Sequence, residues 1–438
     1  MRRRSTGNSL VLHARVFVLR RQTIQTVHHM PIVVQKYGGT SVADPTRIKA
    51  VADRVRDTRA AGNDVVVVVS AMGKTTDELL ELAAEVATTP QPRELDMLLT
   101  TGERITMALL AMALHDRGVP AVSFTGSQAG ILTDSSHGEA RITRITGERV
   151  RQSLEEGKVV IVAGFQGVDP ETKEVTTLGR GGSDATAVAL AAALDADSVE
   201  IFTDVDGVYT ADPRVVPDAR KLDEIPFEEM LELSAGGAGV LMSRSVEVGR
   251  RYEVPIHVRS SFHEGEGTWV RESMEQAIVS GIAYDRSEAK VTVNRVPDRP
   301  GVAALLFGTL ARSGVNLDMI VQNVSHDGNT DISFTVPRSS LGDAERIAKQ
   351  VAAEIRAESV DVDPDIAKVS LVGAGMRSQP GVAARMFETL AAASINIEMI
   401  STSTIRVSCV IRENQVEDAV RVLHEAFEPP TTTEEFGL

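Results

Sequence analysis

The chain has 438 residues, 42% of them hydrophobic, which is enough apolar material for the cores of several domains. The net charge of −15, from 61 acidic and 46 basic residues, argues against non-specific nucleic-acid binding. A single cysteine, Cys409, excludes a disulfide framework and a cysteine-rich zinc site, and it predicts a reducing, cytoplasmic location.

The first 30 residues differ in composition from the rest, because they contain six arginines and no acidic residue. Their apolar stretches are short and interrupted by charge, so the hydrophobic region of a secretory signal is missing. We interpret residues 1–30 as a disordered leader or an over-extended start, with a targeting peptide as the alternative.

Strand-like and helical patterns alternate from residue 31 to about residue 260. The expected strands are 31–35, 65–70, 119–124, 158–165 and 198–203, and the expected helices are 47–59, 76–86, 94–117 and 184–194. Residues 65–69 are five consecutive valines, typical of a strand buried on both faces of a parallel sheet. The alternation predicts an α/β domain over 31–260, with a mostly parallel sheet sandwiched by helices, followed by a connection over 261–285.

The last third of the chain contains an internal repeat. Residues 298–320 and 378–400 are identical at 12 of 23 positions. A strand pattern precedes each copy, so each unit is predicted to run strand, Pro-Gly turn, amphipathic helix, Asn turn, strand. One such unit is too small to bury its own apolar face, so the two are expected to pair. We predict modules at 286–362 and 363–428 and a tail at 429–438.

Two glycine-containing segments of the first domain are suited to a phosphorylated ligand. Residues 36–41 (KYGGTS) place a lysine and two glycines after the first strand, without Walker A or dinucleotide-binding spacing. Residues 179–184 (GRGGSD) precede a helix whose free N–H groups and dipole favour an anion, and Ser183 is expected to cap it. Arg180 can bind a carboxylate through two hydrogen bonds. A plain turn is the alternative interpretation of either segment.

Two further segments carry polar groups of the same kind. Glu103 is suited to holding an ammonium group, and the alternative is a solvated Glu-Arg face. Residues 203–214 (TDVDGVYTADPR) follow a strand and offer Tyr209 to a purine, Arg214 to a phosphate and aspartates to Mg²⁺. An Asp-Gly turn is the alternative for this segment.

Taken together, these segments resemble the aspartate kinases (aspartokinases) of the amino acid kinase superfamily. The resemblance spans about residues 31–425 and rests on KYGGTSV (36–42), VVSAMGKTTDELL (68–80), TGER (101–104), FTGSQAG (124–130), VAGFQGV (162–168), TLGRGGSDATA (177–187) and TDVDGVYTADPR (203–214). The C-terminal repeat resembles two ACT domains. The implied fold is therefore the amino acid kinase fold followed by two ferredoxin-like βαββαβ regulatory modules, as in single-function bacterial enzymes.

The resemblance implies that ATP, with Mg²⁺, phosphorylates the β-carboxylate of L-aspartate to give 4-phospho-L-aspartate, the first step toward lysine, threonine and methionine. The implied catalytic residues are Lys36, Arg180 and Asp184. The implied aspartate-binding residues are Ser41, Ser70, Thr76, Glu103, Arg180 and Ser183. The implied nucleotide-binding residues are Lys36, Gly38, Gly39, Thr203, Asp204, Tyr209, Asp212 and Arg214. The implied effector-binding residues are Asp298, Gly301, Asn316, Asp318, Gln322, Val382, Asn396, Ile397 and Ser403.

The sequence departs from the family pattern in two regions. Gly239 stands where the family usually has a nucleotide-binding lysine, and Arg244 is the candidate substitute. Ala383 and Thr404 stand where close relatives carry Thr and Glu, which predicts threonine sensing with weakened inhibition by lysine. Met274 matches the place where some relatives start an internal regulatory subunit, so a homo-oligomer and an α₂β₂ assembly are both expected alternatives.

Two other functions are consistent with parts of the sequence. Relatives in the superfamily phosphorylate acetylglutamate, glutamate, carbamate or UMP, and the tandem repeat and the TGER motif argue against these substrates. A catalytically weakened amino-acid sensor or partner subunit is the second alternative, supported by Gly239. The presence of Lys36, Glu103, Arg180 and Asp184 together argues against it.

Overall fold

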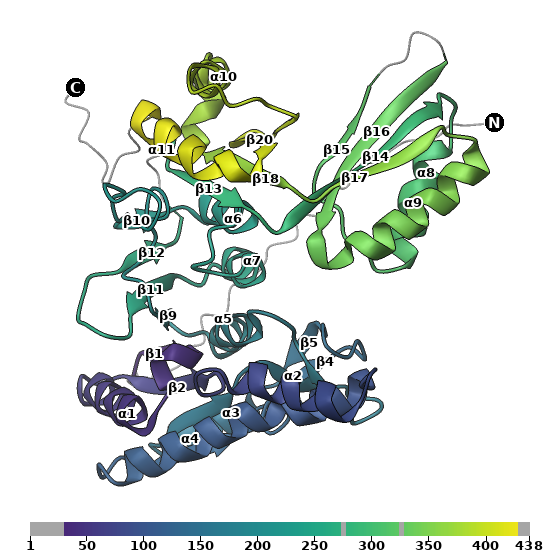
Figure 1. Cartoon of the computed structure of the whole chain (residues 1–438). Helices are drawn as coiled ribbons and strands as arrows, with labels where there is room; N and C mark the ends of the chain where they lie inside the picture. Colours follow the sequence, from purple (N-terminus) through teal and green to yellow (C-terminus); the bar gives the residue numbers. More distant parts are fainter. Residues whose placement is uncertain (1–29, 273–276, 324–327, 428–438) are drawn as a thin grey trace, which may run out of the picture. The chain divides into compact units, whose positions relative to one another are not determined.

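The computed structural model describes residues 30–272, 277–323 and 328–427. The expected leader (1–30, apart from Met30), the internal start at Met274 and the tail at 429–438 lie outside the described residues. Within these ranges the chain forms an α/β domain and two α+β modules (Figure 1).

An eight-stranded sheet forms the centre of the first domain, in the order β10-β12-β11-β9-β1-β2-β6-β3. Its strands are β1 (Ile32–Tyr37), β2 (Asp64–Val69), β3 (Ala121–Phe124), β6 (Val159–Ala163), β9 (Ser198–Thr203), β10 (Glu224–Ile225), β11 (Ile256–Ser260) and β12 (Thr268–Val270). Neighbouring strands are parallel except β11 and β12. All six residues of β2 are buried, as its valine run predicts.

Helices cover both faces of this sheet, which confirms the predicted sandwich (Figure 1). One face packs against α1 (Pro45–Ala60) and α3 (Pro92–His115). The other face packs against α4 (Glu148–Glu155), α5 (Gly182–Leu194), α6 (Phe227–Ala235) and α7 (Ser243–Tyr252). The helix α2 (Thr75–Val86) lies against α3. In the described residues α3 alone has the length and hydropathy to cross a membrane, and here it is a core helix of the α/β domain.

A second, four-stranded sheet with the order β5-β4-β7-β8 was not predicted. Its strands are β4 (Ile131–Thr133), β5 (Ile142–Ile145), β7 (Gln166–Val168) and β8 (Val175–Thr177). Strands of three or four residues are too short to show a period-two pattern in the sequence. This sheet matters for the site because β8 leads directly into the glycine-rich turn before α5.

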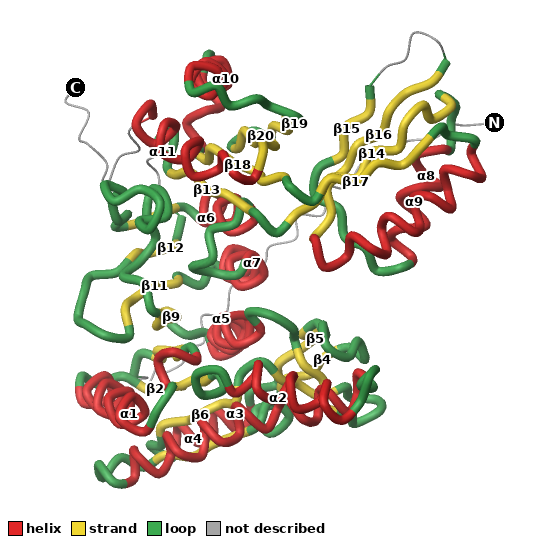
Figure 2. The backbone as a smooth tube through the Cα atoms, viewed as in Figure 1, coloured by secondary structure: helices red, strands yellow, loops and turns green. Residues whose placement is uncertain are grey.

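The C-terminal modules are two four-stranded sheets, each with two helices (Figure 2). The first has the order β15-β16-β14-β17 and consists of β14 (Glu288–Pro297), α8 (Val302–Arg312), β15 (Ile320–Gln322), β16 (Asn329–Pro337), α9 (Leu341–Ile355) and β17 (Ser359–Asp363). The second has the order β13-β18-β20-β19 and consists of β13 (Gly281–Asp285), β18 (Ile366–Val372), α10 (Val382–Ala392), β19 (Met399–Thr402), β20 (Arg406–Arg412) and α11 (Val416–Phe427).

Short 3₁₀ segments lie at Gly39–Val42, Arg338–Ser340, Ala374–Ser378 and Glu413–Gln415. The strand-helix-strand order predicted for each repeat is confirmed. The two equivalent glycines of the Pro-Gly turns, Gly301 and Gly381, cap α8 and α10 with φ of +96° and +100°. Because L-residues with a side chain rarely adopt this conformation, the repeat preserves glycine there.

The segment 261–285, expected as a connection, contains two strands that belong to the sheets on either side of it. It contains β12, which belongs to the sheet of the first domain, and β13, which pairs with β18 of the second module. The second module therefore receives a strand that precedes the first module in the chain. The sequence repeat begins after β13, so the repeat alone gave no sign of this strand.

The two modules are joined by apolar and charged contacts. Met319, Ile366, Met399 and Val410 form one buried cluster across them. Beside this cluster, the almost fully buried Lys368 forms ion pairs with Glu288, at 2.8 Å, and with Asp318. The pairing expected from the repeat is thus present within a single chain.

Candidate active site

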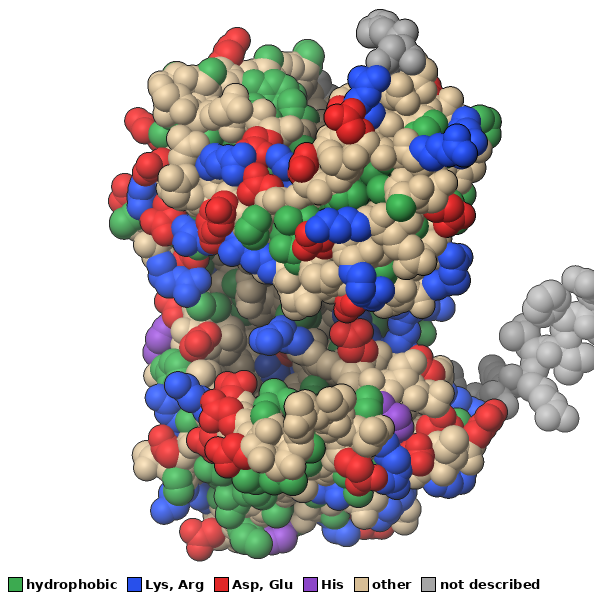
Figure 3. Space-filling model, turned by 45° about the vertical axis from the view of Figure 1, so that its right-hand side comes forward, with side chains coloured by type: hydrophobic (Ala, Val, Ile, Leu, Met, Phe, Trp, Pro, Cys, Tyr) green, Lys and Arg blue, Asp and Glu red, His purple; other side chains and the backbone are tan. Residues whose placement is uncertain are grey.

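A cavity of about 300 Å³ lies at the carboxyl ends of β1 and β2, where parallel α/β sheets commonly bind ligands. It is lined by Lys36, Gly38, Gly39, Ser70, Ala71, Gly73, Thr76, Glu103, Phe165, Gly179, Arg180, Gly181, Gly182, Ser183 and Asp184. Nine of these lining residues are site residues expected from the sequence, brought together from four separate motifs. On the face drawn in Figure 3, acidic and basic side chains are interspersed, and the surface is hollowed across its middle.

A lysine and an aspartate meet inside the cavity. Lys36 on β1 and Asp184 in the first turn of α5 form an ion pair with Nζ and Oδ1 2.6 Å apart. Their side chains are 12% and 11% exposed, so the pair is largely shielded from water. A cation in such a place acts on a phosphoryl group more strongly than it would in bulk solvent.

Two glycines let the backbone approach the cavity closely. A β-carbon at Gly39 would lie 3.0 Å from the carbonyl oxygen of Gly73 and 3.1 Å from that of Ala71. Gly181 has φ of +71° and precedes α5 as its N-cap, with no side chain capping the helix. The expected capping by Ser183 is therefore wrong, because Ser183 is the second residue of the helix. The positive end of the α5 dipole remains directed at the cavity.

Glu103 on α3 is a buried acid with spare bonding capacity. It is 3% exposed, its Oε1 accepts a hydrogen bond from the Ala71 N–H at 3.1 Å, and its Oε2 has no partner in the described part of the chain. Burial raises the pKa of Glu103 to about 7. A buried carboxylate without a partner is unfavourable, so this geometry suits a bound cation such as an ammonium group.

Six of the expected residues do not line the cavity. The buried Ser41 Oγ is hydrogen bonded to Ser261 Oγ at 2.5 Å. The others lie at the end of β9, which is the neighbour of β1 in the sheet, and in the loop after it. They are Thr203, Asp204, Tyr209, Asp212 and Arg214. The Arg214 guanidinium pairs with Asp212 at 2.8 Å, and Asp212 also accepts a hydrogen bond from Tyr284 of β13 at 3.2 Å. This loop therefore contacts the second C-terminal module.

The sequence motifs contained lining residues that were not singled out individually. Ala71 and Gly73 follow Ser70 in one motif, and Phe165 lies in another. Gly179, Gly181 and Gly182 surround Arg180. All of them lie within the motifs named from the sequence, so their membership of those motifs was the available signal.

Arg244, the candidate substitute for the lysine that Gly239 replaces, is bonded to backbone carbonyl groups. Its guanidinium donates to the carbonyl oxygens of Leu178, at 3.3 Å, and Ala140, at 3.0 Å. It therefore braces the turn that precedes α5 and is not a lining residue of the cavity. The space around Gly239 is open, because a β-carbon added there would meet no atom within 4 Å beyond the adjoining residues.

Comparison with known proteins shows the family of the chain. The amino acid kinase family matches residues 31–260, and ACT domains match residues 291–356 and 369–427. The aspartokinase of Mycolicibacterium smegmatis is 58% identical over 405 residues, covering 91% of this chain and 96% of that protein. The chain belongs to the aspartokinases of the amino acid kinase family.

Solved aspartokinase structures share this architecture. Escherichia coli aspartokinase III in complex with aspartate and ADP, in the R-state, is 29% identical, with a TM-score of 0.79 over 91% of this chain and 100% of that one. The same enzyme in complex with lysine and aspartate, in the T-state, is 28% identical, with a TM-score of 0.69 over 90% of this chain and 99% of that one. The aspartokinase identity and the kinase fold with two ACT domains are thus established.

The residues expected to bind an effector are distributed over both ACT domains. Asp318 belongs to the ion pair with Lys368, and the Ser403 hydroxyl donates to Glu232 of α6 at 3.3 Å. Thr404 accepts a hydrogen bond from Arg377 at 3.4 Å. The others occupy turns or element ends around α8 and α10, namely Asp298, Gly301, Asn316, Gln322, Val382, Asn396 and Ile397. Their binding role stays a prediction.

Proposed function

We propose that the chain transfers the γ-phosphoryl group of ATP to the β-carboxylate of L-aspartate, giving ADP and 4-phospho-L-aspartate. The observation that carries this proposal is the convergence of Lys36, Glu103, Arg180 and Asp184 on one cavity. The nucleophile is a carboxylate that is already ionised at neutral pH, so the reaction needs no general base. Positioning and charge stabilisation then supply the catalysis.

Aspartate is held by complementary charges. Arg180 binds the α-carboxylate through two hydrogen bonds, and Glu103 binds the ammonium group through its unpartnered Oε2. Ser70, Thr76 and Ser183 complete the polar wall, with Ser41 behind it. This arrangement leaves the β-carboxylate directed toward Lys36 and selects an α-amino acid with an acidic side chain.

The nucleotide phosphates lie against the glycine turn and Lys36. Gly38 and Gly39 allow the β1 turn to approach the transferred group, and Lys36 Nζ stabilises charge on its oxygens. The nucleotide is bordered by the loop after β9 with Thr203, Asp204, Tyr209, Asp212 and Arg214. The described residues contain no cluster of three metal-ligating side chains, so Mg²⁺ is expected to arrive with the ATP phosphates. When bound there, it neutralises phosphate charge.

A panel of acceptors tests this function. ADP release would be measured with L-aspartate, L-glutamate, N-acetylglutamate and UMP at equal concentration. Aspartate should give turnover at least 100-fold above N-acetylglutamate and UMP, which cannot satisfy Arg180, Glu103 and Lys36 together. It should exceed glutamate, whose side chain is one methylene longer, by about 10-fold or more. Faster turnover with N-acetylglutamate, which lacks the ammonium group, would contradict the assigned role of Glu103 and the proposed substrate.

Replacing Gly239 with lysine should lower the KM for ATP by roughly 10-fold, since one charge-assisted hydrogen bond contributes about 1.5–3 kcal/mol. Gly239 is exposed, and the surrounding space admits a side chain, so the fold should tolerate the change. Gly239→Met, which has similar length without charge, is the matched control. An unchanged KM for ATP in Gly239→Lys would show that this position does not approach the phosphates.

We also propose allosteric control by threonine with weakened sensitivity to lysine. Ala383 lacks the hydroxyl, and Thr404 lacks the carboxylate, that close relatives carry at these positions. A pocket for a cationic effector has therefore lost a negative charge. Lysine up to 1 mM should leave at least half of the activity, while threonine inhibits. Half-inhibition below 1 mM lysine, measured by titration at saturating substrates, would contradict this.

The cellular setting follows from the proposed reaction. The product belongs to the synthesis of lysine, threonine and methionine, and a cytoplasmic location fits the single buried cysteine. The chain is proposed to assemble either as a homo-oligomer or as α₂β₂ with an internally started regulatory subunit.

A further inference from the structure

We propose that Asp96 is a positioning residue that holds Arg180 over the substrate cavity by anchoring the end of β8 to α3. This inference rests on the proposed function, because it assigns the positioning of the residue that binds the α-carboxylate of aspartate. Asp96 lies outside the cavity lining and in none of the motifs that pointed to the site.

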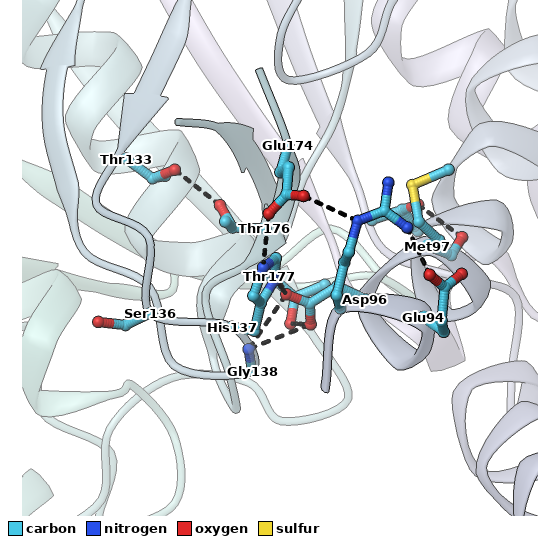
Figure 4. Close-up of polar contacts among 12 residues, drawn as sticks. Glu94, Asp96, Met97, Thr133, Ser136, His137, Gly138, Glu174, Thr176 and Thr177 are labelled. Carbon is cyan, nitrogen blue, oxygen red and sulfur yellow. Dashed lines mark hydrogen bonds and ion pairs between the residues drawn. The ribbon is translucent and has the colours of Figure 1, made fainter. Parts of the chain in front are cut away.

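Asp96 is a buried carboxylate whose oxygens are fully engaged. It is 1% exposed and accepts hydrogen bonds from four donors (Figure 4). Two come from Thr177, with its hydroxyl at 2.6 Å and its N–H at 3.1 Å. The others come from the Gly138 N–H, at 3.1 Å, and from His137 Nδ1, at 2.8 Å. Removing this acceptor would leave several buried donors without a hydrogen bond, which is energetically costly. The four hydrogen bonds therefore fix the position of Thr177 relative to α3.

The anchored strand end leads straight to the substrate site. Thr177 is the last residue of β8, and Arg180 follows three residues later. A β-carbon at Gly179 would be 3.0 Å from the carbonyl oxygen of Gly138, so the loop that Asp96 binds also touches the turn itself. The carbonyl of Thr177 accepts a further hydrogen bond from the Ala140 N–H at 2.8 Å. The start of the turn is therefore fixed from both sides.

The two charged groups that would bind aspartate, Glu103 and Arg180, are thereby both positioned by the helix α3. Asp96 and Glu103 are seven residues apart on α3, two turns of helix, and both are buried. They lie on the same helix face, about 10 Å apart along the axis. Glu103 binds the ammonium group directly, and Asp96 sets the Arg180 turn at a fixed distance from it. The spacing between the two charged groups that recognise aspartate is therefore built into α3.

His137 completes the anchor on its outer side. Its Nε2 approaches Glu174 Oε2 at 3.3 Å (Figure 4). Glu174 in turn pairs with Arg93 at 2.9 Å. Burial alone would lower the pKa of His137, and the hydrogen bonds with Asp96 and Glu174 outweigh it, so the pKa is raised. His137 thus adds a further hydrogen bond to the Asp96 Oδ2 that also accepts from the Thr177 N–H of β8.

The test uses two neighbouring threonines as a matched pair. Thr177→Val removes the hydroxyl that binds Asp96, whereas Thr176→Val removes a hydroxyl that binds Thr133 at 2.6 Å. Both side chains are buried, so both variants should lose similar stability. Thr177→Val should raise the KM for aspartate about 3-fold or more and leave the KM for ATP within 2-fold. Thr176→Val should leave both KM values unchanged.

Replacement of the carboxylate itself should have a larger effect. Asp96→Asn should raise the KM for aspartate about 10-fold or more, since small displacements of a positioning group are costly. The exposed Glu94→Gln on the same helix is the control and should match wild type. In an Arg180→Ala background Asp96→Asn should add less than 2-fold, because a residue that acts through Arg180 has nothing left to position.

The outcomes separate this inference from the proposed function. Aspartate binding by calorimetry is measured beside turnover, so a dissociation constant is available even for an inactive variant. Wild-type protein that neither binds nor phosphorylates aspartate would overturn both proposals. Wild-type protein that does so, with Thr177→Val and folded Asp96→Asn unchanged in aspartate KM and Kd, would overturn the role of Asp96 alone. If Thr177→Val and Asp96→Asn raised the KM for ATP as much as the KM for aspartate, the positioning role of Asp96 would also be overturned.

Discussion

Replacing Lys36 with methionine is expected to lower kcat roughly 10²–10³-fold, the usual effect of removing one preorganised charge-stabilising group. Lys36 Nζ is held 2.6 Å from Asp184 in a cavity that excludes most water. Methionine has a similar length and shape but no charge. The transition state would therefore lose its stabilising cation, while the strand β1 keeps its packing.

The variant is measured by steady-state ADP release with saturating aspartate and ATP. Lys49→Met, on the exposed face of α1, is the matched control and should retain wild-type kcat. Lys36→Arg keeps the charge and should recover part of the activity. If Lys36→Met kept kcat within 3-fold of wild type, the phosphoryl group would not be transferred beside Lys36.

Replacing Glu103 with glutamine should raise the KM for aspartate roughly 10–100-fold, because a hydrogen bond between two charged groups contributes about 1.5–3 kcal/mol. The Oε2 atom of Glu103 is buried and unpartnered, and we assign it to the ammonium group of the substrate. The glutamine keeps the hydrogen bond from Ala71 through its oxygen. The KM for ATP should stay within 2-fold, and an equal rise in both constants would contradict this assignment.

The same residue predicts a pH profile. Because burial raises the pKa of Glu103 to about 7, its ammonium-binding carboxylate form is lost as the pH falls through 7. The kcat/KM for aspartate should therefore decline below about pH 7, and Glu103→Gln should lack this inflection. A wild-type profile that is flat from pH 6 to 8 would be inconsistent with Glu103 as the ammonium ligand.

Glu103 should also lower the stability of the ligand-free protein. Its folded pKa lies above its ordinary value of 4.5, so the folded state binds the proton more tightly than the unfolded chain. Its favourable contribution is then present below pH 4.5 and is lost as the pH rises through 7. Glu103→Gln should accordingly melt at a higher temperature than wild type at pH 8, with the difference shrinking toward pH 5.

The sequence was sufficient for the main features of the architecture and for nine of the residues that line the cavity. The valine run of β2 and the repeat at 298–320 and 378–400 are strong, long-range patterns, and each predicted its element correctly. The motifs that contain Lys36 and Arg180 consist of chemistry-bearing residues in fixed order, so they predicted residues that the fold brings together.

Features that depend on tertiary contacts were beyond the sequence. The strand β13 pairs with β18, although the whole first module lies between them in the sequence. No local sequence pattern identifies a partner strand so far along the chain. Asp96 resembles an ordinary helix acid until the fold places Thr177 against it. The capping of α5 depends on the left-handed conformation of Gly181, which the neighbouring Ser183 does not reveal.

The most direct test of the proposed function is to trap its product. Purified protein would be incubated with ATP, Mg²⁺, L-aspartate and hydroxylamine, and the hydroxamate identified by mass spectrometry. The proposed geometry predicts ATP-dependent β-aspartyl hydroxamate, because Arg180 holds the α-carboxylate away from Lys36, and it predicts strongly reduced product from Lys36→Met. ATP-dependent α-hydroxamate, or no hydroxamate from protein that binds aspartate and ATP, would contradict the account.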